Sequence, residues 1–142
     1  MDVDEARWRF GAARVARLAT ADAKGAPHIV PVTFALDADR VYSVLDAKPK
    51  RSRRLKRLAN IAANPRVAVL ADEYVEDWMR LWWVRAEGAA RIVADGPELE
   101  TARELLAAKY EQYRGATRLI GPAIVVMVER WTGWRARERE RT

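Results

Sequence analysis

The strongest chemical feature of the sequence is a cluster of basic side chains at residues 48–57, where seven of ten residues are Lys or Arg. It follows a run typical of a strand, residues 41–45, and leads into a predicted helix. Backbone N–H groups in the first turn of a helix have no partner within it, and the helix dipole adds positive potential there. Lys and Arg donate charge-assisted hydrogen bonds to phosphate oxygens. The junction predicts an anion site, although a solvated basic helix face fits the same residues.

A group of tryptophans next to arginines is the second feature. Trp78, Trp82 and Trp83 stand close in sequence to Arg80 and Arg85. Flat rings beside guanidinium groups can enclose a planar heterocycle. Neighbouring residues of a strand face opposite sides, so Trp82 and Trp83 cannot both line one pocket. At least one of them must pack in the core or at a dimer interface.

Few residues could act directly in catalysis. Without cysteine the chain has no disulfide framework and no thiolate nucleophile, and its single histidine disfavours a metal site, so none is predicted. Redox chemistry would need a bound cofactor. His28 could serve as a general acid, or it could simply be a packed or exposed strand residue. Tyr110 and Tyr113 fit the apolar stripe of a helix and are predicted to lie in the core.

The elements that must position these residues follow from the apolar spacing. It predicts a short helix at residues 3–10 and two longer helices, one ending at Asn64 before a proline and one capped by Asp95. The first three of six predicted strands should form a meander. We expect one barrel domain over residues 1–142, with helices filling its gaps. The strands are predicted at residues 14–20, 28–36, 41–45, 66–71, 81–93 and 123–131, the last with an extension or bend at 133–135.

The overall charge restricts the partners. A formal charge of +6 admits nucleic acid, a membrane surface or a phosphorylated small molecule. No apolar run approaches the roughly 20 residues of a membrane helix, and the acidic N-terminus is unlike a signal peptide. No motif known to read a nucleic-acid groove is present. We therefore expect a cytoplasmic protein with a small-molecule substrate that binds neither nucleic acid nor membrane.

The order of these segments resembles that of a known family. The strand at residues 16–20, the hairpin strand at 27–34, the basic turn and the sequence Asn64-Pro65 before a strand occur together. In this respect the chain resembles the pyridoxamine 5′-phosphate oxidase-like split-barrel superfamily, and within it the deazaflavin (coenzyme F-420)-dependent oxidoreductases. The resemblance implies a mainly β (α+β) split β-barrel of six to seven antiparallel strands with peripheral helices. It also implies a homodimer with its sites at the subunit interface.

The resemblance also implies which residues bind the cofactor. In the family a hydroxyl residue ends the strand before the basic turn, and a basic pair after it holds the cofactor phosphate. Ser43 and the pair Lys48 and Lys50 resemble these features. Trp82 is a further candidate ring contact, and Arg54 with its basic neighbours suits the extended acidic tail of the deazaflavin. The ring would lie against the backbone of Val30, Pro31, Val32 and Thr33, and the phosphate side at Ser43, Lys48, Lys50, Arg51 and Ser52.

The predicted activity is hydride transfer between the reduced deazaflavin and an unassigned small organic substrate. Because the cofactor carries the chemistry, the chain needs no nucleophile of its own. His28, Tyr42 or water could supply a proton, and the sequence does not choose among them. Vitamin B6 phosphate oxidation is not expected, since no longer C-terminal substrate segment follows Trp134. Three alternatives stay open: an FMN-binding oxidoreductase of the same fold, a non-catalytic cofactor carrier, and a nucleic-acid binder.

Overall fold

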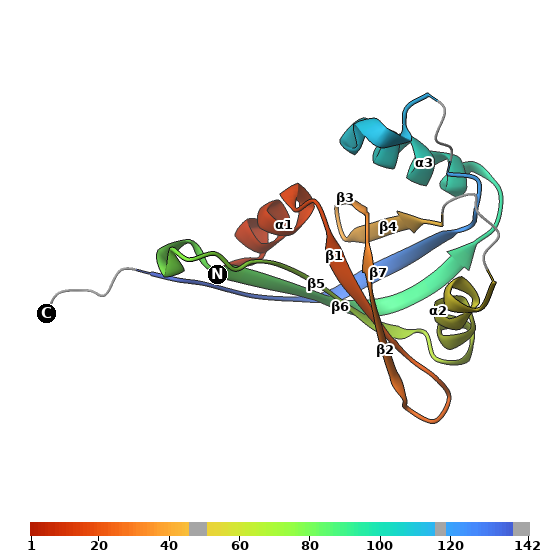
Figure 1. The fold of residues 1–142 in the computed structure, drawn as a ribbon, viewed down its shortest axis with the longest axis horizontal. Coiled ribbons are helices and arrows are strands. Elements are labelled where there is room, and N and C mark those ends of the chain that lie inside the picture. Colours follow the sequence, from red (N-terminus) through yellow and green to blue (C-terminus); the bar gives the residue numbers. More distant parts are fainter. Residues whose placement is uncertain (46–50, 116–118, 138–142) are drawn as a thin grey trace, which may run out of the picture.

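The computed structural model describes residues 1–45, 51–115 and 119–137, with the backbone alone at 51–55. A helix, α1 (Val3–Ala12), precedes two strand pairs, β1 (Ala16–Ala21) with β2 (Pro27–Val32) and β3 (Ala35–Asp37) with β4 (Arg40–Val44). Then follow α2 (Arg51–Ala63), β5 (Arg66–Glu73), the short 3₁₀ helix η1 (Trp78–Arg80), β6 (Trp82–Val93), α3 (Pro97–Lys109), η2 (Glu111–Tyr113) and β7 (Ala123–Arg135). Figure 1 shows these elements along the chain.

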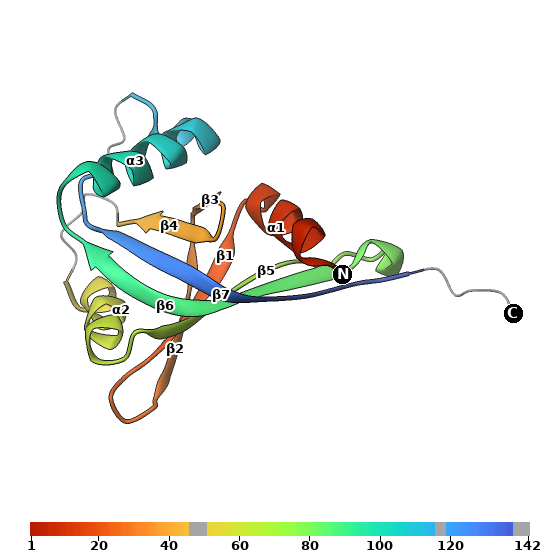
Figure 2. The same ribbon diagram turned by 180° about the vertical axis from the view of Figure 1, so that it is seen from behind.

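The strands form one antiparallel sheet of seven strands in the order β2-β1-β5-β6-β7-β4-β3. β2 and β3 lie at opposite edges, although only Thr33 and Phe34 separate them in sequence. The sheet must therefore curl until its two edges approach each other, and Figures 1 and 2 show this curled shape from both sides. The predicted barrel-like, mainly β fold is confirmed, with β6 and β7 as its two longest strands.

The predicted meander of the first three strands is confirmed in its neighbouring pairs, β1 with β2 and β3 with β4, but not as one continuous meander. Residues 28–36 are not one strand, because the chain leaves β2 at Val32 and enters β3 on the other edge of the sheet. The backbone N–H of Phe34 donates to the hydroxyl of Tyr110 at 3.1 Å instead of to a neighbouring strand. The Thr33 hydroxyl lies 2.7 Å from that of Tyr113. Side chains at the end of α3 and in η2 thus hold the crossing from edge to edge.

Two groups of buried side chains cover the two sides of the sheet. One includes Phe10, Phe34, Trp82 and Ile61, and the other includes Tyr42, Leu99 and Leu106 beneath α3. Alternation along β4 sends Val41 to the first group and Tyr42 with Val44 to the second. The sheet is therefore packed on both faces, which fixes the register of each strand.

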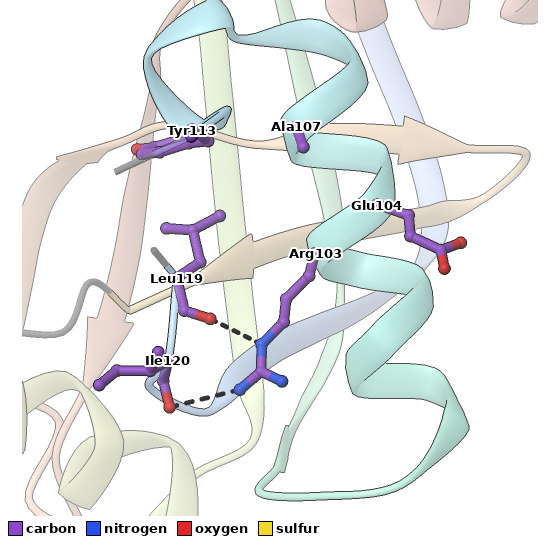
Figure 3. A pocket seen from close by; sticks show the side chains of 7 residues that line it. Arg103, Glu104, Ala107, Tyr113, Leu119 and Ile120 are labelled. Atoms are coloured by element: carbon purple, nitrogen blue, oxygen red, sulfur yellow. Dashed lines mark hydrogen bonds between the residues drawn. The ribbon is translucent and has the colours of Figure 1, made fainter. Parts of the chain in front are cut away.

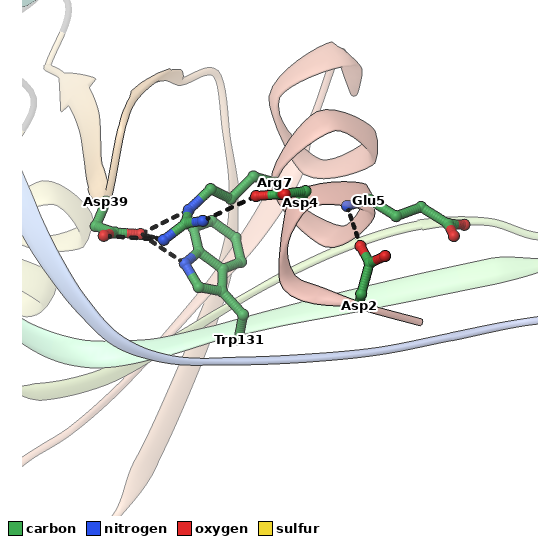
Figure 4. Close-up of polar contacts among 6 residues, drawn as sticks. All are labelled: Asp2, Asp4, Glu5, Arg7, Asp39 and Trp131. Carbon is green, nitrogen blue, oxygen red and sulfur yellow. Dashed lines mark hydrogen bonds and ion pairs between the residues drawn. The ribbon is translucent and has the colours of Figure 1, made fainter.

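The carboxylate of Asp39 links helix α1 to the sheet. Asp39, in the turn between β3 and β4, accepts hydrogen bonds from the indole N–H of Trp131 at 2.8 Å and from Arg7 at 2.9 Å. Figure 4 shows this arrangement, with Asp2 accepting from the Glu5 N–H as the helix cap. The hydrogen bond from the Trp131 indole has the largest effect in lowering the pKa of Asp39 below its ordinary value, and the bond from Arg7 lowers it further. Phe10 on the same helix packs against Phe34 and Trp131, with ring centroids 4.8 and 5.3 Å apart.

The start of α3 differs from the prediction. The N-cap residue is Gly96 with φ 91°, not Asp95, and no side chain caps the helix. Pro97 occupies the first turn as predicted. Tyr110 is buried as predicted, whereas Tyr113 lies outside the helix in η2 and is only partly buried. Among the described residues no helix is long and apolar enough to cross a membrane.

Candidate functional site

The four residues predicted to hold a cofactor ring lie at the end of an edge strand. Val30, Pro31 and Val32 close β2, and Thr33 begins the crossing to β3. β2 pairs only with β1, so the backbone groups on its other edge have no strand partner. Pro31 is exposed and Val32 buried. An edge strand offers N–H and C=O groups to which a flat, polar heterocycle could bind.

Of the residues predicted to hold the phosphate, Ser43 is the one whose side chain the structure describes, and it lies near the crossing from β2 to β3. Ser43 is buried in β4, next to Tyr42, which pairs with Ala35 immediately after the crossing from β2. The strand end is anchored, because the Leu45 N–H donates to the Pro122 carbonyl at 3.0 Å. Lys48 and Lys50 lie outside the described residues. Arg51, Ser52 and Arg54 belong to the first turn of α2, where the structure describes only the backbone.

Contacts in the second half of α2 hold this helix on the sheet. The Asn60 amide donates to the Thr20 hydroxyl at 3.0 Å, and both side chains are buried. Ile61 enters the core, and Lys56 lies 3.9 Å from Asp22. The helix axis is therefore fixed by β1, so its N-terminal turn starts from a fixed scaffold. Strand β4 is followed by helix α2, as predicted for the basic cluster.

His28 lies on β2, opposite Thr20 of β1. Cross-strand partners point to the same face, and Thr20 contacts α2, so His28 faces the α2 side of the sheet. Its Nδ1 atom is buried and has no hydrogen-bond partner among the described residues. The structure thus places His28 on the same strand face as Val30, two residues away. No group of three or more His, Asp or Glu side chains within the described part of the chain could hold a metal.

Trp82 is placed apart from the other predicted cofactor contacts. It lies on β6, three strands from β2, is 7% exposed, and donates its indole N–H to Glu73 at 3.1 Å. Trp83 faces the opposite side, as the alternation predicted, with the Arg85 guanidinium 5.4 Å from its ring centre. A cavity of 470 Å³ adjoins Trp82 between α1 and the sheet. Its lining also includes Trp8, Arg9, Arg14 and Glu73.

A second cavity, of 390 Å³, lies beside α3 (Figure 3). Arg103 crosses one side of it, donating to the Leu119 carbonyl at 2.6 Å and to the Ile120 carbonyl at 3.4 Å. Tyr113 lines it as well, and the hydroxyl of Tyr113 reaches Thr33 of the ring segment. These carbonyl bonds occupy the guanidinium of Arg103, and the lining also carries the carboxylate of Glu104.

The sequence did not indicate two cations at the crossing, Lys109 and Arg14. The Lys109 ammonium lies 3.7 Å from the ring centre of Phe34, and burial lowers its pKa to about 8. The Arg14 guanidinium lies 4.6 Å from the ring centre of Tyr110 and donates to the Lys109 carbonyl. A lysine in the last turn of a helix is ordinary, because it complements the dipole, so no sequence pattern indicates this cluster.

Comparisons with known proteins identify the family and the fold. A 57-residue segment, 40% of this chain, is 39% identical to the 5a,11a-dehydrotetracycline/5a,11a-dehydrooxytetracycline reductase of Streptomyces rimosus. The match spans 39% of that reductase. A conserved hypothetical protein of Mycobacterium tuberculosis shares the fold with a TM-score of 0.72, at 20% identity over 95% of this chain and 85% of that one. A FAD-binding protein of Mesorhizobium loti gives a TM-score of 0.70, at 22% identity over 94% of both chains.

These structural likenesses confirm the predicted split-barrel fold. The family assignment rests on a broader match, since the pyridoxamine 5′-phosphate oxidase family model covers residues 3–135. That span includes the edge strand, the junction before α2 and the crossing at Thr33. The chain therefore belongs to the pyridoxamine 5′-phosphate oxidase family.

Proposed function

We propose that this chain binds a flavin-type cofactor, in the first place the deazaflavin coenzyme F-420, and acts as an oxidoreductase on a small unsaturated substrate. The observation that carries the proposal is the free edge of β2 at residues 30–33, close to the seam where β4 ends and the basic segment begins. A flat ring could bind at the strand edge while the phosphate group of the same molecule binds the basic segment. The reductase that matches part of the chain, and the FAD-binding protein of similar fold, support a flavin-type cofactor.

The predicted residues other than Trp82 would divide the binding of the cofactor among them. The backbone of Val30 to Thr33 would orient the ring, and Ser43 with Lys48, Lys50, Arg51 and Ser52 would bind the phosphate. A bound deazaflavin would supply the hydride, while the buried groups around the crossing exclude water. Arg54 would contact the longer acidic tail of the deazaflavin. FMN, which lacks that tail, is the alternative cofactor.

The direct test is a fluorescence titration of the purified chain with coenzyme F-420 and with FMN. Saturable binding of one deazaflavin per subunit, tighter than FMN, is the expected result. Turnover of the bound reduced cofactor with an unsaturated substrate would separate an enzyme from a carrier. Nucleic-acid affinity that falls steeply with salt, in the absence of cofactor binding, would contradict the proposal.

The double variant Lys48→Ala with Lys50→Ala tests the phosphate site. Each charge-assisted contact contributes on the order of 1.5 to 3 kcal/mol, so losing two should weaken cofactor binding by roughly a hundredfold or more. The matched control is Lys24→Ala with Arg137→Ala, which removes two exposed charges elsewhere. Equal affinity in the test variant and the parent would place the phosphate elsewhere.

Arg54→Ala separates the two cofactors. Its affinity for the deazaflavin should fall more than its affinity for FMN, because only the deazaflavin carries an extended anionic tail. Titration of this variant with both cofactors measures the ratio directly. Equal losses would remove the reason for ranking the deazaflavin above FMN.

A further inference from the structure

The ammonium of Lys109 is buried without a polar partner. Its Nζ atom makes no hydrogen bond, and no carboxylate lies within ion-pair distance among the described residues. It contacts only aromatic faces, 3.7 Å from the ring centre of Phe34 and 5.2 Å from that of Tyr110. Cation–π contacts offset part of the cost of burying a charge, but they satisfy none of the three N–H donors. Buried donors without acceptors are rare in folded proteins and call for a specific explanation.

A second cation stands beside this ammonium. Arg14 lies over the ring of Tyr110, 4.6 Å from its centre, and donates to the Lys109 carbonyl at 3.1 Å. Arg14 likewise has no carboxylate partner in the described part of the chain, and its charge contributes to lowering the pKa of Lys109. Two neighbouring cations without a counter-ion repel each other. An anion between them would relieve that repulsion.

The negative end of the α3 dipole does not account for Lys109. Arg114 donates to the carbonyls of Ala107 and Ala108, each at 2.7 Å, and Arg14 takes that of Lys109. The Tyr110 N–H donates to the Leu106 carbonyl. The last carbonyls of the helix are thus already satisfied by other groups, so the ammonium of Lys109 is available for a different acceptor.

The position of the two cations relates them to the cofactor segment. Phe34, which carries the ammonium on its ring face, directly follows Thr33. Thr33 is held by the Tyr113 hydroxyl at 2.7 Å. Arg14 also lines the 470 Å³ cavity, whose other walls include Trp8 and Trp82. That volume is in the range of small-molecule sites, and its aromatic walls suit a flat molecule.

We propose that Lys109 and Arg14 bind the carboxylate of a planar substrate beside the cofactor segment. The inference rests on the proposed function for the neighbouring ring site, which it extends by naming the substrate class. A carboxylate can serve both cations at once, because each of its two oxygens can accept a hydrogen bond from one of them. The ammonium would leave the Phe34 ring face to donate to a carboxylate oxygen, while the flat body of the substrate occupies the cavity toward Trp82.

The test uses the full chain and two probes of equal shape, 2-naphthoate and the uncharged 2-naphthamide. Binding is measured by titration calorimetry, and the backbone amide signals of Phe34, Lys109 and Tyr110 are followed by NMR. A charge-assisted contact predicts that 2-naphthoate binds about tenfold or more tightly than the amide. The probe should shift all three amide signals in a saturable manner.

Lys109→Met keeps the length of the side chain and removes its charge, so the two probes should then bind with about equal affinity. Lys24→Met, which removes an exposed lysine of the β1–β2 turn, should retain the preference of the parent. The inference is overturned if Lys109→Met keeps the preference, or if 2-naphthoate shifts none of the three amide signals. Thermal unfolding of both variants shows whether they are folded, and Lys109→Arg offers a charged variant should the methionine variant fail to fold.

A parallel titration with coenzyme F-420 and FMN keeps the two proposals apart. If cofactor binds but 2-naphthoate shows no preference over the amide, only the carboxylate site is wrong. If 2-naphthoate binds as expected but neither cofactor does, the proposed function fails and the anion site stands on its own. Lys109→Met should bind both cofactors as tightly as the parent, because Lys109 is not among the residues proposed to bind the cofactor ring or its phosphate.

Discussion

At the scale of single residues, Lys109 is the side chain whose surroundings depart furthest from those of its residue type. Exposed lysines keep their charge in water, whereas the Lys109 ammonium lies against two aromatic rings and next to Arg14. Burial and the like charge both disfavour the protonated form, which lowers its pKa to about 8 from 10.5. The neighbouring Tyr110 hydroxyl stabilises the crossing from β2 to β3. It accepts a hydrogen bond from the Phe34 N–H and donates one to the Arg14 carbonyl.

This shift predicts how stability changes with pH. Between pH 8 and 10.5 the unfolded chain holds a proton on Lys109 that the folded chain has lost, so the unfolding free energy should rise with pH. At pH 7 both states are protonated, and the folded state bears the full cost of the buried charge. Urea unfolding at pH 7 and pH 10 should therefore show Lys109→Met losing stability relative to the parent as pH increases.

Lys24→Met is the control for the pH series, because it removes an exposed lysine in the β1–β2 turn. A difference between the Lys109→Met variant and the parent that stays constant from pH 7 to pH 10 would show that the amine of Lys109 is not perturbed. The same result would contradict the description of the Lys109 ammonium as buried without a polar partner.

Sequence patterns could predict the basic junction between β4 and α2 but not the residues around Lys109. Seven basic residues in ten, placed after a strand, mark the junction in the sequence itself. The Lys109 cluster joins residues 14, 34 and 109–113, which are far apart along the chain. Only the curling of the sheet and the placement of α3 bring them together, and no local periodicity records that. Trp82, in contrast, was correctly placed on the opposite strand face from Trp83.

At the scale of elements, the pairing of β6 with β7 depends on one glycine. The register between them shifts at Glu87 and Gly88, which forms a bulge where the long strands bend. A Cβ atom at Gly88 would overlap the carbonyl oxygen of Met127 and lie 2.8 Å from its carbonyl carbon. The obstacle is backbone of a central strand, which cannot turn aside as a flexible side chain would.

Gly88→Ala should therefore destabilise the fold by about 3 kcal/mol, through displacement of β7 from β6. Chemical denaturation measures the change. The matched control is Gly11→Ala in α1, where the new Cβ would lie 3.4 Å from a Leu36 side-chain carbon and alanine favours the helix. A Gly88→Ala variant as stable as the parent would mean that the two strands can separate without cost.

The strands that the sequence predicted best are those with long, unbroken patterns. The predicted strand at 81–93 is observed as Trp82–Val93, and the one at 123–131 continues through its predicted extension to Arg135. The pattern at residues 28–36 misled, because β-type residues continue through Thr33 and Phe34 without a glycine or a turn signal. Tertiary contacts end β2. They come from the hydroxyl groups of Tyr110 and Tyr113, which belong to a distant segment of the chain.

At the scale of the whole molecule, large aromatic side chains gather where β6 begins and β7 ends. Figures 1 and 2 show these strand ends extending beyond the rest of the sheet, with η1 beside them. Trp78 on η1 is 74% exposed and Trp134 near the end of β7 is 44% exposed, although Trp82 and Trp131 pack inward. Met79 is half exposed next to Trp78. Exposed apolar groups of this size at one end of the molecule are typical of an interface.

We predict that the chain is a homodimer that buries Trp78, Met79 and Trp134 between two copies. A stable symmetric dimer covers roughly 800 Å² per subunit, which several large side chains on one projecting region can provide. Sedimentation at micromolar concentration should give twice the chain mass of 16.2 kDa. Trp78→Glu with Met79→Glu should shift the equilibrium to monomer, because burying two carboxylates without partners is costly. Ile120→Glu is the control, since Ile120 is equally exposed but lies beside α3 (Figure 3). A parent chain that sediments only as a monomer would contradict the prediction, and a variant that remains dimeric would place the interface on another surface, with the open edges of β2 and β3 as the next candidates.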